Sequence, residues 1–433
     1  MMIAPLALLA LVAAPAAGPR ILSLEEALAN ARALQPQLRQ ASAAVSAGLA
    51  RADEARAPLL PQVNGSAAYQ RTTGNFTSRP GSLPRQVSGN GGAESWETFP
   101  FVNLGVNASQ LLYDFGQSRS RWRSAESLSS SLKQTGQVTL EQVLLAVRIA
   151  YYQTRAAKGL VQVANDTLAN QQKHLEQTQG FVEVGTQAPI ALAQARTGVA
   201  NARVQLINAQ NGYETAKAQL NLAMGVEGPT DYDVADDAAP AVDGEDGTTE
   251  DLVGEAVKAR SELAALADQV AAQKLALRAA RGAYGPSLSL STGLTDAGQQ
   301  ASSLTWNWNA ALTLSIPIFL GGQTRAQVSE AEANLMSAEA QLDQERQQVR
   351  LEVEQARLAV RAAKAAVTAS AEALASAQEQ LRLAEGRYQT GVGSIIELSD
   401  AQVALTTAAQ QTVQSDYTLA QARAQLVRAL GRD

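Results

Sequence analysis

Leu320-Gly321-Gly322-Gln323-Thr324-Arg325 repeats the pattern of Asp114-Phe115-Gly116-Gln117-Ser118-Arg119 at an offset of 206 positions. The offset holds without a gap when residues 116–225 are set against residues 322–431. A repeat of this length predicts two copies of one structural unit rather than a single irregular domain. We therefore expect an internally duplicated chain of mixed α and β structure, mainly α, in which each half runs helix, strand, loop, strand, long helix, turn, helix.

The expected boundaries follow from this alignment and from the patterns of apolar residues. The first repeat spans residues 18–225, with a helix, a β-hairpin over 62–113, a long helix over 116–180 and a helix over 186–224. The second repeat spans residues 252–433, with a helix, a β-hairpin over 286–318, a long helix over 322–388 and a helix over 394–430. Residues 226–251 hold ten Asp or Glu and no Lys or Arg, so we interpret them as an acidic, solvated linker between the repeats.

The two long helices carry a heptad repeat, which is typical of coiled coils. In the second repeat the apolar residues at every seventh position are Val353, Val360, Val367, Leu374 and Leu381. Small residues follow three positions after most of them, and the first repeat has the same pattern from Val147 to Leu175. Helix axes approach closely at small residues, and a helix over 116–180 would reach about 98 Å at 1.5 Å per residue. These helices predict an elongated coiled-coil assembly, of which an isolated rod is one possible form.

Residues 305–316 alternate between apolar and polar side chains, as a strand with two different faces does. The apolar members are Trp306, Trp308, Ala310, Leu312, Leu314 and Ile316. Asp296 is the only charged residue from 286 to 322, whereas the edge of a soluble sheet normally carries more charge. We expect the apolar face to meet lipid, with Trp306 and Trp308 as anchors at the membrane interface. An ordinary β-sandwich with one buried face is the alternative.

Four strands, two from each predicted hairpin, are too few to close a transmembrane barrel. The smallest known barrels have about eight strands, and an open edge in lipid leaves backbone groups without hydrogen bonds. Several chains must therefore share one barrel if these strands lie in a membrane. This argument allows a dimer with eight strands or a trimer with twelve.

The composition argues against an enzyme and against a nucleic-acid-binding protein. The chain has no cysteine and one histidine, His174, which all but excludes thiol nucleophiles, Cys/His metal sites and histidine-based triads. Its net charge of −6 offers no basic surface for phosphates. We expect no cofactor, and we interpret His174 as a surface residue of a long helix.

The N-terminus predicts export. Residues 2–17 are almost wholly apolar and end in Ala14-Pro15-Ala16, a pattern at which signal peptidase can cut. We therefore expect residues 1–17 to be a signal peptide; a buried or disordered N-terminal segment is the alternative, because no Lys or Arg precedes the apolar stretch. Trp122 lies among three arginines just after the second strand, and is either a further anchor at the membrane interface or part of a solvated helix start.

The turns before the last helix of each repeat resemble those of the TolC-like outer membrane efflux proteins. The first turn is Phe181-Val182-Glu183-Val184-Gly185-Thr186. The second is Arg387-Tyr388-Gln389-Thr390-Gly391-Val392-Gly393-Ser394-Ile395-Ile396-Glu397-Leu398-Ser399-Asp400-Ala401-Gln402. The doubled order of helix, hairpin and helix is similar as well, so the likeness covers nearly all of the chain after residue 17.

The resemblance implies a homotrimer whose chains each contribute four strands to a twelve-stranded transmembrane β-barrel in the outer membrane. A long periplasmic α-helical barrel of coiled-coil helices would continue it, with residues 226–251 in an equatorial belt. Proteins of this family are passive exit ducts of efflux or secretion systems, and they dock at the periplasmic tip to an adaptor protein and an inner-membrane pump. A periplasmic coiled-coil adaptor or a structural rod of the cell envelope is the competing hypothesis.

The resemblance also assigns candidate site residues at the tip. Tyr388, Glu397 and Asp400 match the periplasmic gate, where acidic residues would ring the closed entrance and attract cations. The candidate adaptor-contact residues are Val184, Gly185 and Thr186 in the first turn and Thr390, Gly391 and Val392 in the second. Ser394 followed by Glu397 also forms a capping-box pattern, so a purely capping role for Glu397 is the alternative.

The gate departs from the family pattern at two positions. Gly393 stands where the family has an Arg, and Ala191 stands where it has an Asp, so the charged links of the family's gate are missing. We expect packing around Pro189 and Ile395, or other polar contacts, to hold the entrance closed.

Overall fold

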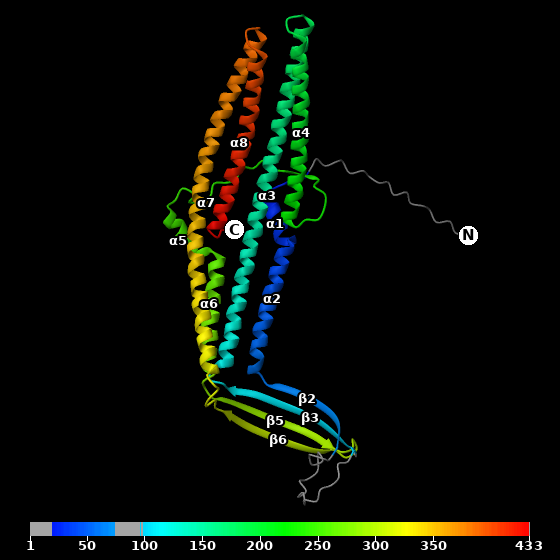
Figure 1. The fold of residues 1–433 in the computed structure, drawn as a ribbon, viewed down its shortest axis with the longest axis vertical. Coiled ribbons are helices and arrows are strands. Elements are labelled where there is room, and N and C mark those ends of the chain that lie inside the picture. The colour runs from blue at the N-terminus through cyan, green and yellow to red at the C-terminus, as the bar shows by residue number, and fades with distance from the viewer. Residues whose placement is uncertain (1–19, 74–95, 97, 433) are drawn as a thin grey trace, which may run out of the picture. The chain divides into compact units, whose positions relative to one another are not determined.

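The computed structural model describes residues 20–73, 96 and 98–432, and the expected signal peptide over residues 1–17 lies outside them. The described chain is mainly helical, with one four-stranded and one two-stranded sheet (Figure 1). Its helices are α1 (Leu24–Leu34), α2 (Pro36–Arg56), α3 (Gln117–Glu183), α4 (Pro189–Met224), α5 (Thr249–Ala259), α6 (Ser261–Gly282), α7 (Gln323–Gln389) and α8 (Ile395–Ala429), with a 3-10 turn at Ala57–Leu59. Its strands are β1 (Arg20–Leu22), β2 (Gln62–Thr73), β3 (Thr98–Tyr113), β4 (Tyr232–Val234), β5 (Ser287–Gly298) and β6 (Thr305–Ser315).

The described residues form two compact units. Unit 1 contains residues 20–42, 136–261 and 346–432, and unit 2 contains residues 43–135 and 262–345 among those described. The helices α3 and α7 are 67 residues long each and contribute residues to both units.

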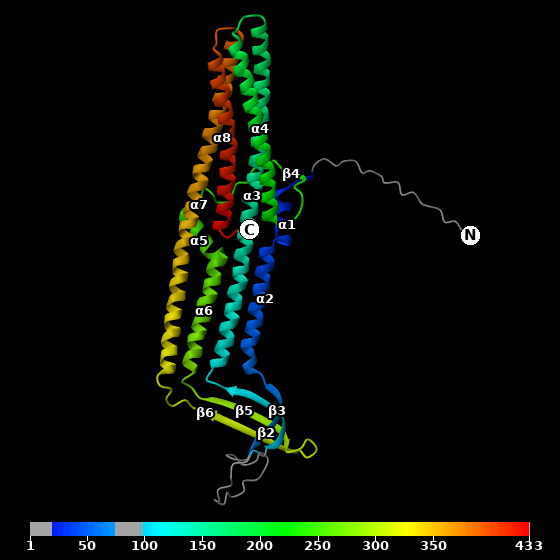
Figure 2. The same cartoon turned by 45° about the vertical axis from the view of Figure 1, so that its right-hand side comes forward.

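In unit 1 the C-terminal part of α3 lies beside α4, and the C-terminal part of α7 lies beside α8 (Figures 1 and 2). The predicted heptad positions are buried or half-buried there: Val147 of α3 and Val353 and Val360 of α7 are at most 1% exposed, whereas Val367 and Leu374 are half-buried. Most of the small residues that follow them are buried too, namely Ala150, Ala164, Ala356, Ala363, Ser370 and Ala377. The heptad prediction is therefore confirmed in unit 1.

A core cluster of unit 1 lies where α1, α3, α4 and β4 meet. Tyr151 is fully buried at its centre, beside Leu220 and Met224 of α4. Burial raises the pKa of the Tyr151 hydroxyl to about 12, so this group stays neutral. The hydroxyl lies 3.3 Å from the carbonyl oxygen of Leu22, to which it donates a hydrogen bond.

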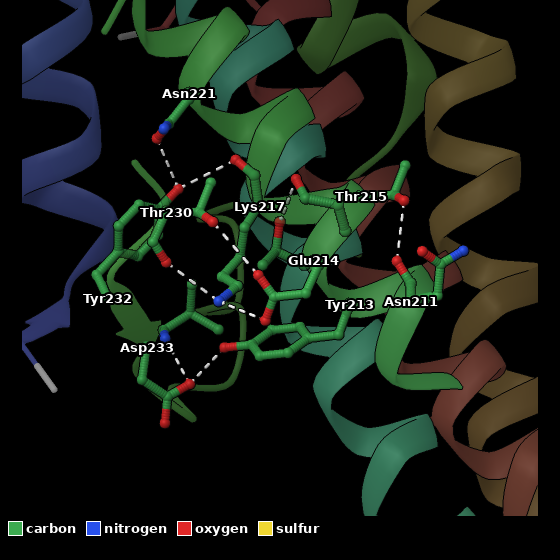
Figure 3. Close-up of polar contacts among 12 residues, drawn as sticks. Asn211, Tyr213, Glu214, Thr215, Lys217, Asn221, Thr230, Tyr232 and Asp233 are labelled. Atoms are coloured by element: carbon green, nitrogen blue, oxygen red, sulfur yellow. Dashed lines mark hydrogen bonds and ion pairs between the residues drawn. The ribbon is translucent and has the colours of Figure 1, made fainter. Parts of the chain in front are cut away.

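The first part of the acidic segment over residues 226–251 folds back onto α4 (Figure 3). Lys217 of α4 donates a hydrogen bond to the carbonyl of Thr230 at 3.1 Å. The hydroxyl of Tyr213 donates to the carboxylate of Asp233, and β4 pairs in parallel with β1. These contacts hold the chain after α4 against that helix.

The second part of the same segment is held by the other helical pair of unit 1. Glu245 is 8% exposed, and Arg423 of α8 donates two hydrogen bonds to its carboxylate at 3.0 and 3.1 Å. Nζ of Lys364 on α7 lies 2.7 Å from the same carboxylate. The segment is therefore anchored at several points, which differs from the solvated linker that we expected. The basic partners of Glu245 lie more than a hundred residues away in sequence, so the composition of the segment could not indicate them.

In unit 2 the four longer strands form one antiparallel sheet in the order β2-β3-β5-β6 (Figure 1). The strand register aligns the alternating residues of each strand with those of its neighbours. Val106 lies opposite Gly65 and Leu294, and Leu294 lies opposite Trp308. Most apolar positions of the four strands therefore share one face, and most polar positions share the other; Arg71 and Asp296 lie on the apolar face, opposite Pro100 and Trp306.

The helices of unit 2 pack through small and hydroxyl-bearing residues. Ser131 of α3 donates a hydrogen bond to the carbonyl of Ala265 in α6 at 2.8 Å. A Cβ added at Gly48 of α2 would lie 2.7 Å from Cδ1 of Leu132 in α3, so this glycine permits a close approach of the two helices.

Candidate functional site

The turns between the paired helices of unit 1 have the same backbone geometry. Gly185 and Gly391 have φ angles of +77° and +79°, in the left-handed region that favours glycine. Thr186 and Val392 donate backbone hydrogen bonds at 2.9 and 3.1 Å to carbonyls five positions back, which is the Schellman end of a helix. The residues assigned to adaptor contact all lie exposed on these turns, and they are Val184, Gly185, Thr186, Thr390, Gly391 and Val392.

Tyr388 joins the two helical pairs near these turns. It is 3% exposed, and its hydroxyl accepts a hydrogen bond from Nε2 of Gln187 at 2.8 Å and lies 3.3 Å from Oγ1 of Thr178. Its ring meets the rings of His174 and Phe181 edge-on, with centroids 5.4 and 5.8 Å apart. We call these five residues the Tyr388 cluster. Within one chain, a candidate gate residue of the second turn thus contacts the first turn through neutral groups.

His174 lies inside this cluster with an exposed fraction of 6%, so its interpretation as a surface residue is wrong. It occupies the heptad position just before Leu175, at the edge of the seam of α3. Side chains at that position are solvated in an isolated pair of helices, but here Tyr388 of α7 covers the histidine. Burial lowers the pKa of His174 from its ordinary value, because a charged imidazolium would lose its hydration there.

The two acidic gate candidates lie on the first turns of α8. The hydroxyl of Ser394 accepts a hydrogen bond from the backbone N–H of Glu397 at 3.1 Å, so Ser394 caps this helix. The carboxylate of Glu397 also forms an ion pair with Nε of Arg387 across the turn, at 3.0 Å. Asp400 is exposed one turn further along the same helix. Glu397 is therefore partly neutralised by a partner that its spacing in the sequence did not indicate.

The two positions that depart from the family pattern are also constrained by packing. A Cβ at Gly393 would lie 2.8 Å from the backbone nitrogen of Tyr388, so any larger residue there would require the turn to shift. Ala191 is only 8% exposed, which leaves little room for a charged side chain. The missing charged links therefore coincide with positions that this turn geometry reserves for small residues.

The apolar face of the sheet in unit 2 is exposed. Its large exposed side chains are Val63, Tyr69, Leu104, Val106, Leu290, Leu294, Trp306, Trp308, Leu312 and Leu314. The opposite face carries short neutral side chains, among them Asn64, Asn103, Asn107, Ser289, Ser291, Asn307, Asn309 and Thr313. A sandwich with one buried face does not account for this exposure, so that alternative is wrong for the described sheet.

The three tryptophans that we assigned to membrane anchoring have different surroundings. Trp306 and Trp308 are 69% and 62% exposed on the apolar face, and Nε1 of Trp308 donates a hydrogen bond to Oγ1 of Thr292 at 3.0 Å. Trp122 is half-buried, with the guanidinium carbon of Arg56 5.5 Å from its ring centroid. Its cationic partner comes from α2 rather than from its own flanking arginines.

Within the described ranges, 20–73, 96 and 98–432, no three side chains of His, Cys, Asp or Glu are grouped so as to hold a metal ion. No helix in that part of the chain is long and apolar enough to cross a membrane.

Three residues of the tip have roles that were not predicted from the sequence. Arg387 lies in the motif that we quoted, but its pairing with Glu397 depends on how the turn closes. The heptad register already placed His174 beside the seam, and this signal could have identified it as buried. No pattern in the sequence indicates that Gln187 meets Tyr388, because the two belong to different turns.

Long coiled-coil helices combined with a sheet that exposes an apolar face and an uncharged polar face are typical of channel proteins that enter a membrane through strands. The profile of the outer membrane efflux protein family matches residues 27–226 and 252–432, so this chain belongs to that family.

Named relatives agree with this assignment. The chain is 27% identical over 326 residues to the cation efflux system protein CusC of Escherichia coli, a match that covers 71% of this chain and 64% of CusC. It is 26% identical over 387 residues to the probable efflux pump outer membrane protein TtgC of Pseudomonas putida, covering 87% of this chain and 76% of TtgC. A crystal structure of CusC has a similar fold, with a TM-score of 0.80 at 22% identity over 98% of this chain and 96% of that chain.

Proposed function

We propose that this protein is a trimeric outer-membrane channel, the passive exit duct of a tripartite efflux or secretion system. Three chains would share a twelve-stranded β-barrel, and their long helices would form the periplasmic part of the duct. An adaptor protein and an inner-membrane pump would dock at the turns between the paired helices. The protein would have no catalytic role, and the pump would supply the energy.

The observation that carries this proposal is the sheet of unit 2. Its register gathers the apolar residues of four strands on one face, where Trp306, Leu312 and Leu314 are 60% or more exposed. Its other face is polar but uncharged, which suits a water-filled lumen. Burying so large an apolar face in lipid would be strongly favourable, at about 25 cal/mol for each Å² removed from water.

The edges of the same sheet support assembly from several chains. Within the described structure β2 pairs only with β3, and β6 pairs only with β5, so one side of each edge strand is open. Because all neighbours in the sheet are antiparallel, β2 and β6 run in opposite directions. The β6 strand of a second chain can therefore extend the sheet at β2 in the same antiparallel pattern, and lipid requires the ring to close.

Cysteine cross-linking tests this assembly cleanly, because the native chain has no cysteine. Asn64 on edge strand β2 and Asn107 on inner strand β3 lie opposite each other on the polar face. Asn64→Cys, combined with single cysteines placed in turn along β6, should give covalent trimers in outer membranes. Asn107→Cys in the same combinations is the matched control and should give none.

Two further outcomes decide between the duct and the alternatives. A detergent-solubilised complex of three chains that gives single-channel currents in a planar bilayer would support the duct. A protein that extracts into buffer without detergent would instead be a coiled-coil rod or adaptor, and the proposal would then fail.

Docking at the tip is a separate part of the proposal. Val184 and Val392 are 72% and 71% exposed on turns whose glycines adopt left-handed backbone angles, a surface suited to contact with another protein. Val184→Asp with Val392→Asp should abolish export while the trimer and its conductance are retained. Loss of the trimer itself would mean that these residues serve assembly rather than docking.

A further inference from the structure

The buried histidine of the Tyr388 cluster has no role in the duct described so far. His174 is the only histidine in the chain, and its Nδ1 is buried without a hydrogen-bond partner among the described residues. A neutral imidazole tolerates such a position, since it loses one hydrogen bond to water. An imidazolium would add an N–H donor and a full charge that the site does not satisfy.

His174 also lies at a contact that connects the two helical pairs of unit 1. Its ring packs edge-on against Tyr388, whose hydroxyl reaches both α3 and the first turn through Thr178 and Gln187. Leu381 and Leu398, which are 7% and 2% exposed, help to close the cluster on the side of α7 and α8. A change at His174 therefore acts on the packing between α3 and α7 near the proposed entrance.

We propose that neutral His174 holds Tyr388 in the packed arrangement seen in this structure, which we call closed, and that protonation of His174 loosens the contact between α3 and α7. The assignment of this movement to opening of a channel entrance rests on the proposed function, whereas the proton-linked loosening does not.

The charges around the cluster do not offset a proton on the imidazole. The charged residues on the stretches of helix next to the cluster are Lys173, Glu176 and Glu183 on α3, Arg196 on α4, Glu379, Arg382, Glu385 and Arg387 on α7, and Glu397 and Asp400 on α8. All are exposed except Glu385, which is half-buried. Burial is the cause that lowers the pKa of His174, with no neighbouring carboxylate acting against it.

The direction of the pH effect follows from that shift. In the open arrangement His174 would meet water and titrate near the ordinary value of about 6.5. In the closed arrangement its pKa is lower, so the closed contact binds fewer protons. The closed contact is therefore most stable above about pH 6.5. As the pH falls below that value, the equilibrium constant for closing decreases by at most about tenfold per pH unit for each chain.

The loosening can be measured on the full-length protein in detergent. Hydrogen exchange of peptides covering residues 170–183 and 381–390, corrected for the intrinsic effect of pH, should speed up several-fold from pH 7.5 to 5.5. His174→Phe keeps an aromatic ring at this position and removes the titration, so its exchange should not change over that range. Glu176→Gln, an exposed change on the same helix, is the control and should behave as the native protein.

A direct titration keeps the proposal testable even if the Phe variant does not assemble. Because the chain has one histidine, carbon-13 labelling of histidine gives a single imidazole signal, and its pKa in the native protein should lie below 6.5. A pKa at or above 6.5 would overturn the proposal.

Channel recordings between pH 5.5 and 7.5 then test the link to the entrance, in a range where ordinary carboxylates stay ionised. The native protein should open more often at pH 5.5, and His174→Phe should lose this dependence. Equal pH profiles for both proteins would refute the role of His174 at the entrance. Absence of any current at either pH would refute the channel proposal instead, and would leave the hydrogen-exchange result to decide on the loosening.

Discussion

Glu245 shows how a single side chain anchors the acidic segment of unit 1. Burial by itself would raise the pKa of this carboxyl, but hydrogen bonds from Arg423 and Lys364 outweigh it and hold the pKa at about 2. The group is therefore charged throughout the physiological range, and it is satisfied by two cations from different helices. A buried, fully paired carboxylate of this kind is costly to leave without its partners.

We predict that Arg423→Ala lowers the stability of this anchor by about 3 kcal/mol, because it leaves Glu245 buried with one cation fewer. Hydrogen exchange of residues 239–246 would measure the loss. Arg382→Ala on α7 is the matched control, since Arg382 pairs with Glu379 where both side chains are more than half exposed. Its effect should stay below about 1 kcal/mol. Equal effects of the two changes would contradict the assignment of Glu245 as an anchor.

The same anchor has a defined pH dependence. The folded-state pKa of Glu245 lies near 2, below its ordinary value of 4.5, so the stabilisation is present above pH 4.5 and is lost as the pH falls toward 2. We expect the acidic segment to open in this window in the native protein. Glu245→Gln should be less stable at pH 7 and should show a flatter pH profile below 4.5. An unchanged profile would place the acid-sensitive group elsewhere.

Neighbouring residues of β6 test the face assignment of the sheet. Leu312 lies on the exposed apolar face and Thr313 on the polar face. An arginine on the lipid side of a barrel costs about 2 to 4 kcal/mol near the midplane. Leu312→Arg should therefore abolish assembly in the outer membrane, and Thr313→Arg should be tolerated, as judged by trimer bands from membrane fractions. The opposite result would reverse the two faces.

Among the elements, α8 shows how a sequence pattern and a tertiary contact combine. The cap at Ser394 could be predicted from the spacing to Glu397, and the structure confirms the hydrogen bond to the Glu397 amide. We predict that Ser394→Ala destabilises the start of α8 by about 1 kcal/mol. Ser399→Ala, an exposed change on the same helix, should cost much less. Thermal melting of the purified protein compares the two, and similar melting points would mean that the cap contributes little.

For the assembled protein, the acidic residues Glu397 and Asp400 near the second turn predict a response to cations. If three copies of Glu397 and Asp400 surround one axis, multivalent cations added on the periplasmic side should block single-channel current, more weakly at high salt. The double change to Ala should remove the block. Because Arg387 pairs with Glu397, Arg387→Ala should strengthen it. Block that persists unchanged in the double variant would leave Glu397 a capping and ion-pairing residue only.

The periodic features of this chain could be predicted from its sequence, because a heptad seam and a strand alternation each depend on residues close together in the chain. Val353 and Val360 are buried as their spacing indicates, and Trp308 and Leu312 share a face as theirs does. The cap at Ser394 is local in the same sense. For these features, backbone geometry alone determines which side chains point the same way.

Other features depended on contacts between segments that are distant in sequence. Tyr388 could be named from its motif, but its burial and its hydrogen bond to Gln187 arise where two turns meet. His174 and the segment that holds Glu245 were expected to be solvated for the same reason, since each looks solvated until helix α7 packs against it. Burial and charge pairing are properties of two surfaces together, and the sequence of one segment describes only one of those surfaces.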